Sequence, residues 1–142
     1  MIGLDCNILV QLAIADHPAN SATLAKVTAE TAKAEKLVFP PLVATEFLHV
    51  VTDPRRIQPP LTMVEAISWL RTFLDSSSVG LVHSSDNSLR LTFEWMQKYN
   101  LGRKRILDTQ LASILWTNGV SRLITSNPRD FEIFPELELV TP

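Results

Sequence analysis

The 142-residue chain contains a single cysteine, Cys6, and only three histidines. One cysteine cannot form an internal disulfide bond, which excludes the small disulfide-stabilised domains and favours a reducing, cytoplasmic environment. The histidines stand alone in the sequence, at His17, His49 and His83, and form none of the close pairs that zinc sites usually contain. A zinc site is therefore not expected.

Long hydrophobic runs are also missing. No stretch approaches the roughly 18 apolar residues that a membrane-spanning helix needs. The apolar N-terminal segment carries Asp5 in its middle and lacks a basic lead-in, so it does not resemble a signal peptide. Hydrophobic residues nevertheless make up 46% of the chain, which is enough to bury a core. No repeat or linker divides the chain, so residues 1–142 are expected to form one domain.

The chain lacks an excess of basic residues: 13 lysines and arginines face 15 aspartates and glutamates, for a net charge of −2. A protein that binds nucleic acid through one broad basic face usually carries a net positive charge, so composition does not favour that mode of binding. A local basic cluster can still attract phosphate whatever the net charge. Composition alone therefore indicates only a soluble intracellular domain.

What the chain does contain is a regular alternation of short apolar strands and helical segments. Apolar runs predict strands at residues 1–4, 37–39, 79–82, 123–125 and 137–140. Helices are expected between them, over residues 19–36, 42–51, 62–74, 86–99 and 108–117. Because neighbouring parallel strands need a crossover, this order predicts an α/β fold with one parallel sheet and helices on both of its faces.

Local signals predict several helix ends. Thr62 is followed three residues later by Glu65, the spacing of a capping box, and Asp86 is expected to cap the next helix. Pro40 and Pro41 suit the start of a helix. The prolines among residues 52–61 predict a loop.

Three carboxylates, those of Asp5, Glu46 and Asp108, interrupt three of the most apolar segments of the chain. A carboxylate is expensive to bury unless it is paired, hydrogen-bonded or bound to a metal ion. Considered singly, Asp5 and Asp108 are well explained as helix N-caps and Glu46 as a partly exposed helix position. In open parallel sheets, however, ligands gather beyond the carboxyl ends of the strands. Together the three acids therefore indicate one shared site.

Hard divalent cations such as Mg²⁺ bind a few carboxylates and keep several waters. Such an ion can activate a water for attack on phosphorus and can neutralise charge on the leaving oxygen. A site made of Asp5, Glu46 and Asp108 would therefore suit metal-dependent hydrolysis of phosphodiester bonds.

Four short motifs, in order, resemble those of the PIN-domain ribonucleases, and most closely those of the VapC toxins of bacterial type II toxin–antitoxin systems. They are Asp5-Cys6-Asn7, Thr45-Glu46-Phe47, the ILDTQLA segment at residues 106–112 and the ITSNPRDF segment at residues 124–131. Their order, their spacing and the length of the chain all fit. The resemblance therefore covers essentially the whole chain.

The resemblance implies a PIN-like α/β/α sandwich with a short parallel sheet, formed as a single domain by residues 1–142. It implies an acidic pocket that binds Mg²⁺ or Mn²⁺ and a ribonuclease that hydrolyses RNA phosphodiesters. It also implies a homodimer and inhibition by a cognate antitoxin protein. The RNA target stays open, because specificity would depend on base contacts that the sequence does not locate.

Carried over residue by residue, the resemblance makes Asp5, Glu46 and Asp108 the metal ligands and catalytic acids. The fourth acid of the family usually stands two residues after the threonine that corresponds to Thr125, where this chain has Asn127. An amide adds no negative charge, so Asn127 is kept as a catalytic candidate and only one firmly held ion is expected. The auxiliary candidates are Asp130, Thr125, Ser126 and Asn7.

Basic residues lie next to two of these motifs. Arg103, Lys104 and Arg105 precede Asp108, and Arg129 lies within the last motif. We expect Arg103, Arg105 and Arg129 to contact RNA phosphates. Lys104 is expected to be an ordinary solvated residue.

Two other functions compete with that of a nuclease. Phosphoryl transfer through an aspartyl nucleophile usually needs a second aspartate where this chain has Asn7, and a lysine that is missing between Asp108 and Asp130. A catalytically weak or inactive module that binds RNA or protein is the stronger alternative, because Asn127 replaces an acid. It predicts binding without turnover.

Overall fold

The computed structural model describes all 142 residues and contains one sheet of five short strands. The strands are β1 (Ile2–Leu4), β2 (Leu37–Phe39), β3 (Val79–Leu81), β4 (Arg122–Ile124) and β5 (Glu138–Val140). Their order across the sheet is β3-β2-β1-β4-β5, and every neighbouring pair is parallel. The predicted parallel sheet is confirmed, with β1 at its centre.

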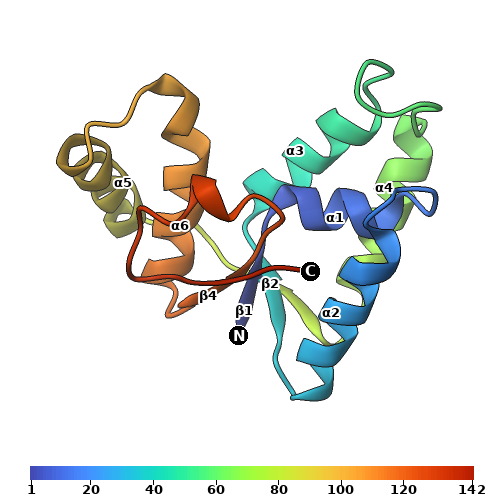
Figure 1. Cartoon of the computed structure of the whole chain (residues 1–142), viewed down its shortest axis with the longest axis horizontal. Coiled ribbons are helices and arrows are strands. Elements are labelled where there is room, and N and C mark those ends of the chain that lie inside the picture. The colour runs from blue at the N-terminus through green and yellow to red at the C-terminus, as the bar shows by residue number, and fades with distance from the viewer.

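Six α-helices flank this sheet: α1 (Cys6–Ala13), α2 (Asn20–Ala32), α3 (Pro41–Val51), α4 (Met63–Leu74), α5 (Asp86–Lys98) and α6 (Ile106–Thr117). Figure 1 shows α1 to α4 gathered on one side of the sheet and α5 and α6 on the other. Helices on the same side of the sheet also contact one another: α1 contacts α3, and α5 contacts α6. The predicted layers, with helices on both faces of the sheet, are confirmed. None of these helices is long and apolar enough to cross a membrane.

Helix α1 is not predicted from the sequence, because its segment is short and mostly apolar and its two polar residues, Asn7 and Gln11, mark a helical spacing only once. Its buried residues are Cys6, Ile8, Leu9, Val10 and Gln11. Helix α1 contacts both α2 and α3, which explains why it is apolar on more than one side. The neighbouring α2 ends at Ala32, earlier than predicted, and Ala34 just beyond it adopts a left-handed conformation with φ of 62°.

The capping box that begins α4 is confirmed. The backbone N–H of Glu65 donates to the Thr62 hydroxyl at 3.2 Å, and the Glu65 carboxylate accepts from the Thr62 backbone N–H at 2.8 Å. The predicted cap of α5 is wrong by one residue, because Ser85 and not Asp86 is the N-cap. Ser85 and Ser88 form their own capping box, which leaves Asp86 in the first turn, where a negative charge favours the helix dipole.

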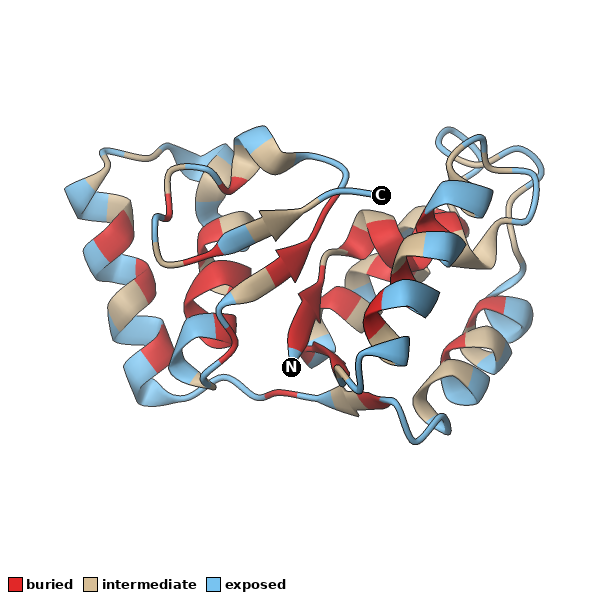
Figure 2. Cartoon of the chain, turned by 60° about the horizontal axis from the view of Figure 1, so that its bottom comes forward, coloured by how far each residue is buried: buried red, intermediate tan, exposed pale blue.

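The strands carry apolar residues almost continuously because both faces of the sheet are covered. Ile2, Leu4, Leu37, Val38 and Phe39 are all buried in one hydrophobic core cluster of 28 residues. Figure 2 shows the buried residues concentrated on the strands and on the helix faces turned toward them. Because the faces of the sheet are buried, polar side chains that meet a ligand are expected at the ends of the strands.

The order of the strands defines where a ligand would bind. The central strand β1 has β2 as its neighbour on one side and β4 on the other. The chain forms β2 directly after α2 but reaches β4 only after α5 and α6. In parallel sheets a crevice forms at such a switch point, beyond the carboxyl ends of the two strands. Asp5 follows β1 and Thr125 follows β4, and the Asp5 N–H donates to the Ile124 carbonyl at 3.1 Å. The predicted gathering of polar residues at this edge therefore has a structural basis.

Gly3 in β1 allows α6 to pack directly against the centre of the sheet. A methyl group at this position would lie 2.6 Å from a methyl of Leu115, which is fully buried, and 3.3 Å from the backbone carbonyl oxygen of Arg122. We predict that Gly3→Ala lowers the free energy of unfolding by roughly 1–3 kcal/mol, the usual cost of overpacking. Urea denaturation measures this change.

Gly102→Ala is the matched control, because nothing lies within 4 Å of the added methyl and the backbone is not left-handed there. Its free energy of unfolding should stay close to that of the wild type. Equal stability of the two variants would show that α6 can move away from β1 at no cost.

Candidate active site

A pocket of about 310 Å³ lies at the carboxyl end of the central strand. Its polar lining residues are Asp5, Asn7, Gln11, His17, Glu46, Asp108, Asn127 and Asp130. They come from the junction of β1 with α1, from α1, α3 and α6, and from the segments that follow α1 and β4. The structure thus brings the three acids predicted from separate segments into one pocket, together with Asn127.

Asp5 is held in place by three hydrogen bonds. It is the N-cap of α1, as its position after the strand predicts, and its Oδ1 accepts from the Cys6 backbone N–H at 2.7 Å. Its Oδ2 accepts from the Asn7 amide and from the Thr125 hydroxyl, each at 2.7 Å. Burial raises the pKa of Asp5, and these hydrogen bonds act in the opposite direction. The carboxylate is therefore fixed in direction although its charge is only partly compensated.

The turn after β4 is bonded to the start of α1. The side-chain Oδ1 of Asn7 accepts from the Ser126 backbone N–H at 3.2 Å, while the Thr125 hydroxyl accepts from the Asn127 N–H at 3.0 Å. Three of the predicted auxiliary residues, Asn7, Thr125 and Ser126, therefore come together beside Asp5. Their observed contacts orient Asp5 and the turn.

Gln11 and Thr23 are site residues that the motifs do not contain. Gln11 is buried, its Nε2 donates to the Ser126 hydroxyl at 2.8 Å, and its Oε1 accepts from the Thr23 hydroxyl at 2.6 Å. Thr23 in turn is fully buried in α2. These bonds connect α2 to the turn through α1. The one sequence signal for them is a glutamine within an otherwise apolar segment.

Glu46 reaches the pocket because α3 packs on α1. It lies in the middle of α3, close enough to Asp5 for the two carboxylates to repel each other. Burial is the main reason that the pKa of Glu46 is raised, and this repulsion adds to it. Arg56, which the motifs also do not contain, opposes the shift from the proline-rich loop.

Asp108 lies in the first turn of α6. Its explanation as an N-cap is wrong, because α6 begins at Ile106 and its N-cap is Arg105. The pKa of Asp108 is raised to about 6, first by burial and then by repulsion from Asp130 and Asp5. Arg105 opposes the shift, with its Nε 3.5 Å from Oδ2 of Asp108.

Asp130 supplies the fourth carboxylate of the pocket. It lies in a 3₁₀ turn, Pro128–Asp130, and it contributes more than any other charged neighbour to the raised pKa of Asp108. It also raises the pKa of Asp5. Asn127 lines the same pocket as a neutral amide. The negative charge missing at Asn127 is therefore present nearby, on the side chain three residues later.

The three predicted phosphate contacts have different environments. Arg103 and Arg129 are exposed and form no ion pair, so their charges are available to a ligand. Arg105 is instead turned inward, toward Asp108 and the backbone carbonyl of Asp130. Lys104 is exposed, in agreement with its expected solvation.

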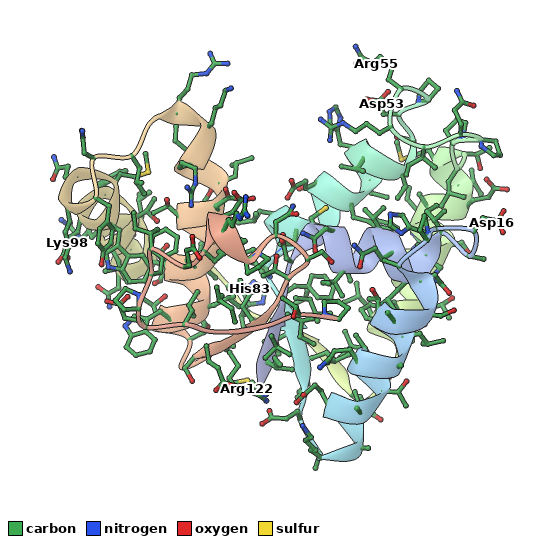
Figure 3. The ribbon with its side chains drawn as sticks, in the orientation of Figure 1. Asp16, Asp53, Arg55, His83, Lys98 and Arg122 are labelled. Atoms are coloured by element: carbon green, nitrogen blue, oxygen red, sulfur yellow. The ribbon has the colours of Figure 1, made fainter.

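Acidic residues at the opposite end of the sheet are paired. Glu30 is buried, and Arg122 donates to it at 3.0 Å. Hydrogen bonds from Arg122 and Lys33 lower the pKa of Glu30. Figure 3 places Arg122 at the end of the molecule away from the loop that carries Asp53 and Arg55. Unbalanced carboxylates therefore gather at the pocket, while the buried acid elsewhere has a cationic partner.

The pocket residues fit a hard divalent cation by their chemistry. Four carboxylates repel one another across the pocket, and an ion of opposite charge would relieve this repulsion. The ligands on offer are oxygen atoms, which Mg²⁺ and Mn²⁺ prefer, since the raised pKa of Cys6 keeps its thiol protonated. No three acid, histidine or cysteine side chains are close enough to surround an ion as they stand. Binding would therefore require the carboxylates to turn toward a common point.

Solved structures similar to this chain come from bacterial toxin–antitoxin systems. VapBC2 of Rickettsia felis, bound to a promoter DNA fragment, has a TM-score of 0.71 at 22% identity, over 99% of this chain and 98% of that one. VapC20 of Mycobacterium tuberculosis, a toxin that cleaves the sarcin–ricin loop, has a TM-score of 0.65 at 15% identity over 87% of each chain. A toxin–antitoxin complex from Klebsiella pneumoniae has a TM-score of 0.65 at 19% identity, over 100% of this chain and 98% of that one.

No protein-family model matches the sequence, and neither does any curated protein. The structural likeness nevertheless defines the class of fold: a parallel sheet between helical layers, of the PIN-like type. Within that class, the chain has the fold of the VapC toxins. The predicted fold is confirmed.

The raised pKa of Asp108 predicts how the stability of the metal-free protein depends on pH. Its carboxyl binds a proton more tightly in the folded protein than in the unfolded chain, so protonation favours folding. This contribution is fully present below the ordinary pKa of an aspartate and is lost as the pH rises through about 6. Asp108→Asn removes it.

We therefore expect the melting temperature in EDTA to fall less for Asp108→Asn than for the wild type between about pH 4.5 and about pH 7.5. Circular dichroism measures both curves. Asp75→Asn, at an exposed position outside the pocket, should follow the wild type. Parallel curves for Asp108→Asn and the wild type would contradict the prediction.

Proposed function

We propose that this protein is a metal-dependent endoribonuclease, the toxin of a type II toxin–antitoxin pair that acts in the cytoplasm. The observation that carries the proposal is the convergence of four mutually repelling carboxylates, those of Asp5, Glu46, Asp108 and Asp130, at the switch point of the sheet. The fold supports it, because VapC20, which has the same fold, is a toxin that cleaves the sarcin–ricin loop.

Asp5, Glu46 and Asp108 would hold Mg²⁺ or Mn²⁺. When bound, the ion would supply an activated water and would stabilise charge on the leaving oxygen of a phosphodiester. The protein contributes the orientation of Asp5, through Asn7 and Thr125, and a pocket lined on one side by the Asn127 amide. No group with a specially tuned pKa is required as a general base.

Exposed cations near the acids would bind the RNA backbone. Arg103 precedes α6 and Arg129 lies in the same turn as Asp130, so both flank segments that carry pocket acids. Arg56 acts on Glu46 from the other side of the pocket. Neutralising phosphates in this way would make RNA binding depend on salt.

The partner would be an antitoxin protein. VapBC2 and the Klebsiella structure are both complexes of a toxin with its antitoxin, and each covers nearly all of this chain. The homodimer implied by the sequence motifs is retained as part of the proposal.

The alternative function is a binding module that has lost its chemistry. It was suggested by the amide at Asn127, which leaves one family acid without a counterpart. The presence of Asp130 in the pocket weakens this argument, because it restores the number of carboxylates to four.

The central test is RNA cleavage by the purified protein with Mg²⁺, with Mn²⁺ and with EDTA. We expect cleavage only with metal. Asp5→Asn and Asp108→Asn should each lower the rate by about 100-fold or more, because losing a residue that merely supports a metal ligand already costs roughly 10–100-fold. Asp75→Asn, which lies outside the pocket, should leave it unchanged.

RNA binding without cleavage under any metal would establish the binding module. Cleavage that survives both Asp5→Asn and Asp108→Asn would place the active site elsewhere. Expression in bacteria gives an independent readout, because a toxin should arrest growth and its Asp5→Asn form should not.

A second test decides whether Asp130 or Asn127 serves as the fourth metal-binding position. If Asp130 supplies the fourth charge, Asp130→Asn should raise the Mn²⁺ concentration needed for half-maximal cleavage by roughly 10-fold. Asn127→Ala should change it less, since no charge is lost. Glu132→Gln is the control, because this exposed acid lies in the same segment but outside the pocket. A larger effect of Asn127→Ala would assign the fourth position to the amide.

A further inference from the structure

Arg105 connects two separate segments that each supply an acid to the pocket. Its Nε lies 3.5 Å from Oδ2 of Asp108, one turn further along the chain in α6. Its terminal amino group donates to the backbone carbonyl of Asp130, in the turn between β4 and β5. One side chain therefore touches both the first turn of α6 and the turn that carries Asp130.

The surroundings of Arg105 differ from those of its neighbours. Arg103 and Lys104 lie in the same 3₁₀ turn, Arg103–Arg105, and are exposed, whereas the Arg105 side chain is only 27% exposed. Its Nε is buried and makes no hydrogen bond, so Asp108 is the group that balances it. Removing a guanidinium from water is costly unless its charge is compensated. An arginine that only contacts phosphate would gain nothing from this position.

A hydrogen bond to its backbone holds Arg105 in position. The Arg105 carbonyl accepts a hydrogen bond from the Thr109 hydroxyl at 2.7 Å, which holds Arg105 against the first turn of α6. Thr109 is fully buried. The guanidinium therefore extends from an anchored point toward the Asp130 turn.

We propose that Arg105 is a positioning residue of the acidic pocket, which ties the first turn of α6 to the turn of Asp130 and so fixes the separation of the two segments whose carboxylates would turn toward a metal ion. The proposal deepens the proposed nuclease function and rests on it for the purpose of the ion. It replaces the expectation that Arg105 contacts RNA phosphate. It also predicts that Arg105 raises metal affinity, although it is itself a cation.

The test is calorimetric titration of MnCl₂ into the metal-free full chain, with no RNA present. We expect Arg105→Gln to bind Mn²⁺ about 10-fold more weakly, as is usual when a residue that orients metal ligands is removed. Arg105→Lys should also bind more weakly than the wild type, because a single ammonium cannot replace a planar fork that reaches two groups. Lys104→Gln, a charge removed from the same turn, should bind like the wild type.

Three results would overturn the proposal. Tighter Mn²⁺ binding by Arg105→Gln would show that Arg105 competes with the ion. Unchanged Mn²⁺ binding, combined with weaker RNA binding by Arg105→Gln in EDTA, would return Arg105 to the role of a phosphate contact. Full recovery by Arg105→Lys would show that its charge alone matters.

The readout is independent of turnover. Wild-type protein that binds Mn²⁺ but cleaves no RNA would refute the nuclease and leave the role of Arg105 intact. If the wild type cleaves RNA and Arg105→Gln keeps the wild-type Mn²⁺ affinity, the nuclease function stands and the role of Arg105 is refuted. Thermal unfolding checks that each variant is folded. If Arg105→Gln does not fold, the Mn²⁺ affinity of Arg105→Lys decides the proposal.

Discussion

The parallel pairing of β1 with β4 is the constraint on which the whole pocket depends. It places the residue after β1, Asp5, beside the residue after β4, Thr125, and a 2.7 Å hydrogen bond joins them. Each neighbouring element then adds one acid: α3 adds Glu46, α6 adds Asp108 and the following turn adds Asp130. Segments distant in sequence meet here because a crossover returns every strand to the same edge of the sheet.

The pocket concentrates like charge that the rest of the protein avoids. Burial and repulsion raise the pKa of Asp5, Glu46 and Asp108, whereas the buried Glu30 is neutralised by Arg122. Clusters of this kind lower stability and persist at sites where a ligand or reaction uses them. Arg105 opposes the raised pKa of Asp108 and Arg56 that of Glu46, yet neither cation outweighs burial and repulsion.

The sequence predicts the fold and the three main acids well, because these follow from local signals. Strands covered on both faces are apolar throughout, and a carboxylate within such a segment stands out. Helix α1 is missed because an apolar segment of eight residues with a single i, i+4 polar pair is too short to establish a helical period. The roles of Arg105, Gln11 and Arg56 depend on contacts between distant segments, which a local pattern does not report.

Gly3 also bears on the width of the active site. Glu46 belongs to a helix of one layer and Asp108 to a helix of the other, so their separation depends on how closely each layer approaches the sheet. At Gly3 the approach of α6 is close, because Leu115 rests directly on the glycine. Any shift of α6 that made room for a side chain there would also move Asp108 relative to Glu46. A residue without a functional group, two positions before Asp5, thus helps to set the gap that an ion must bridge.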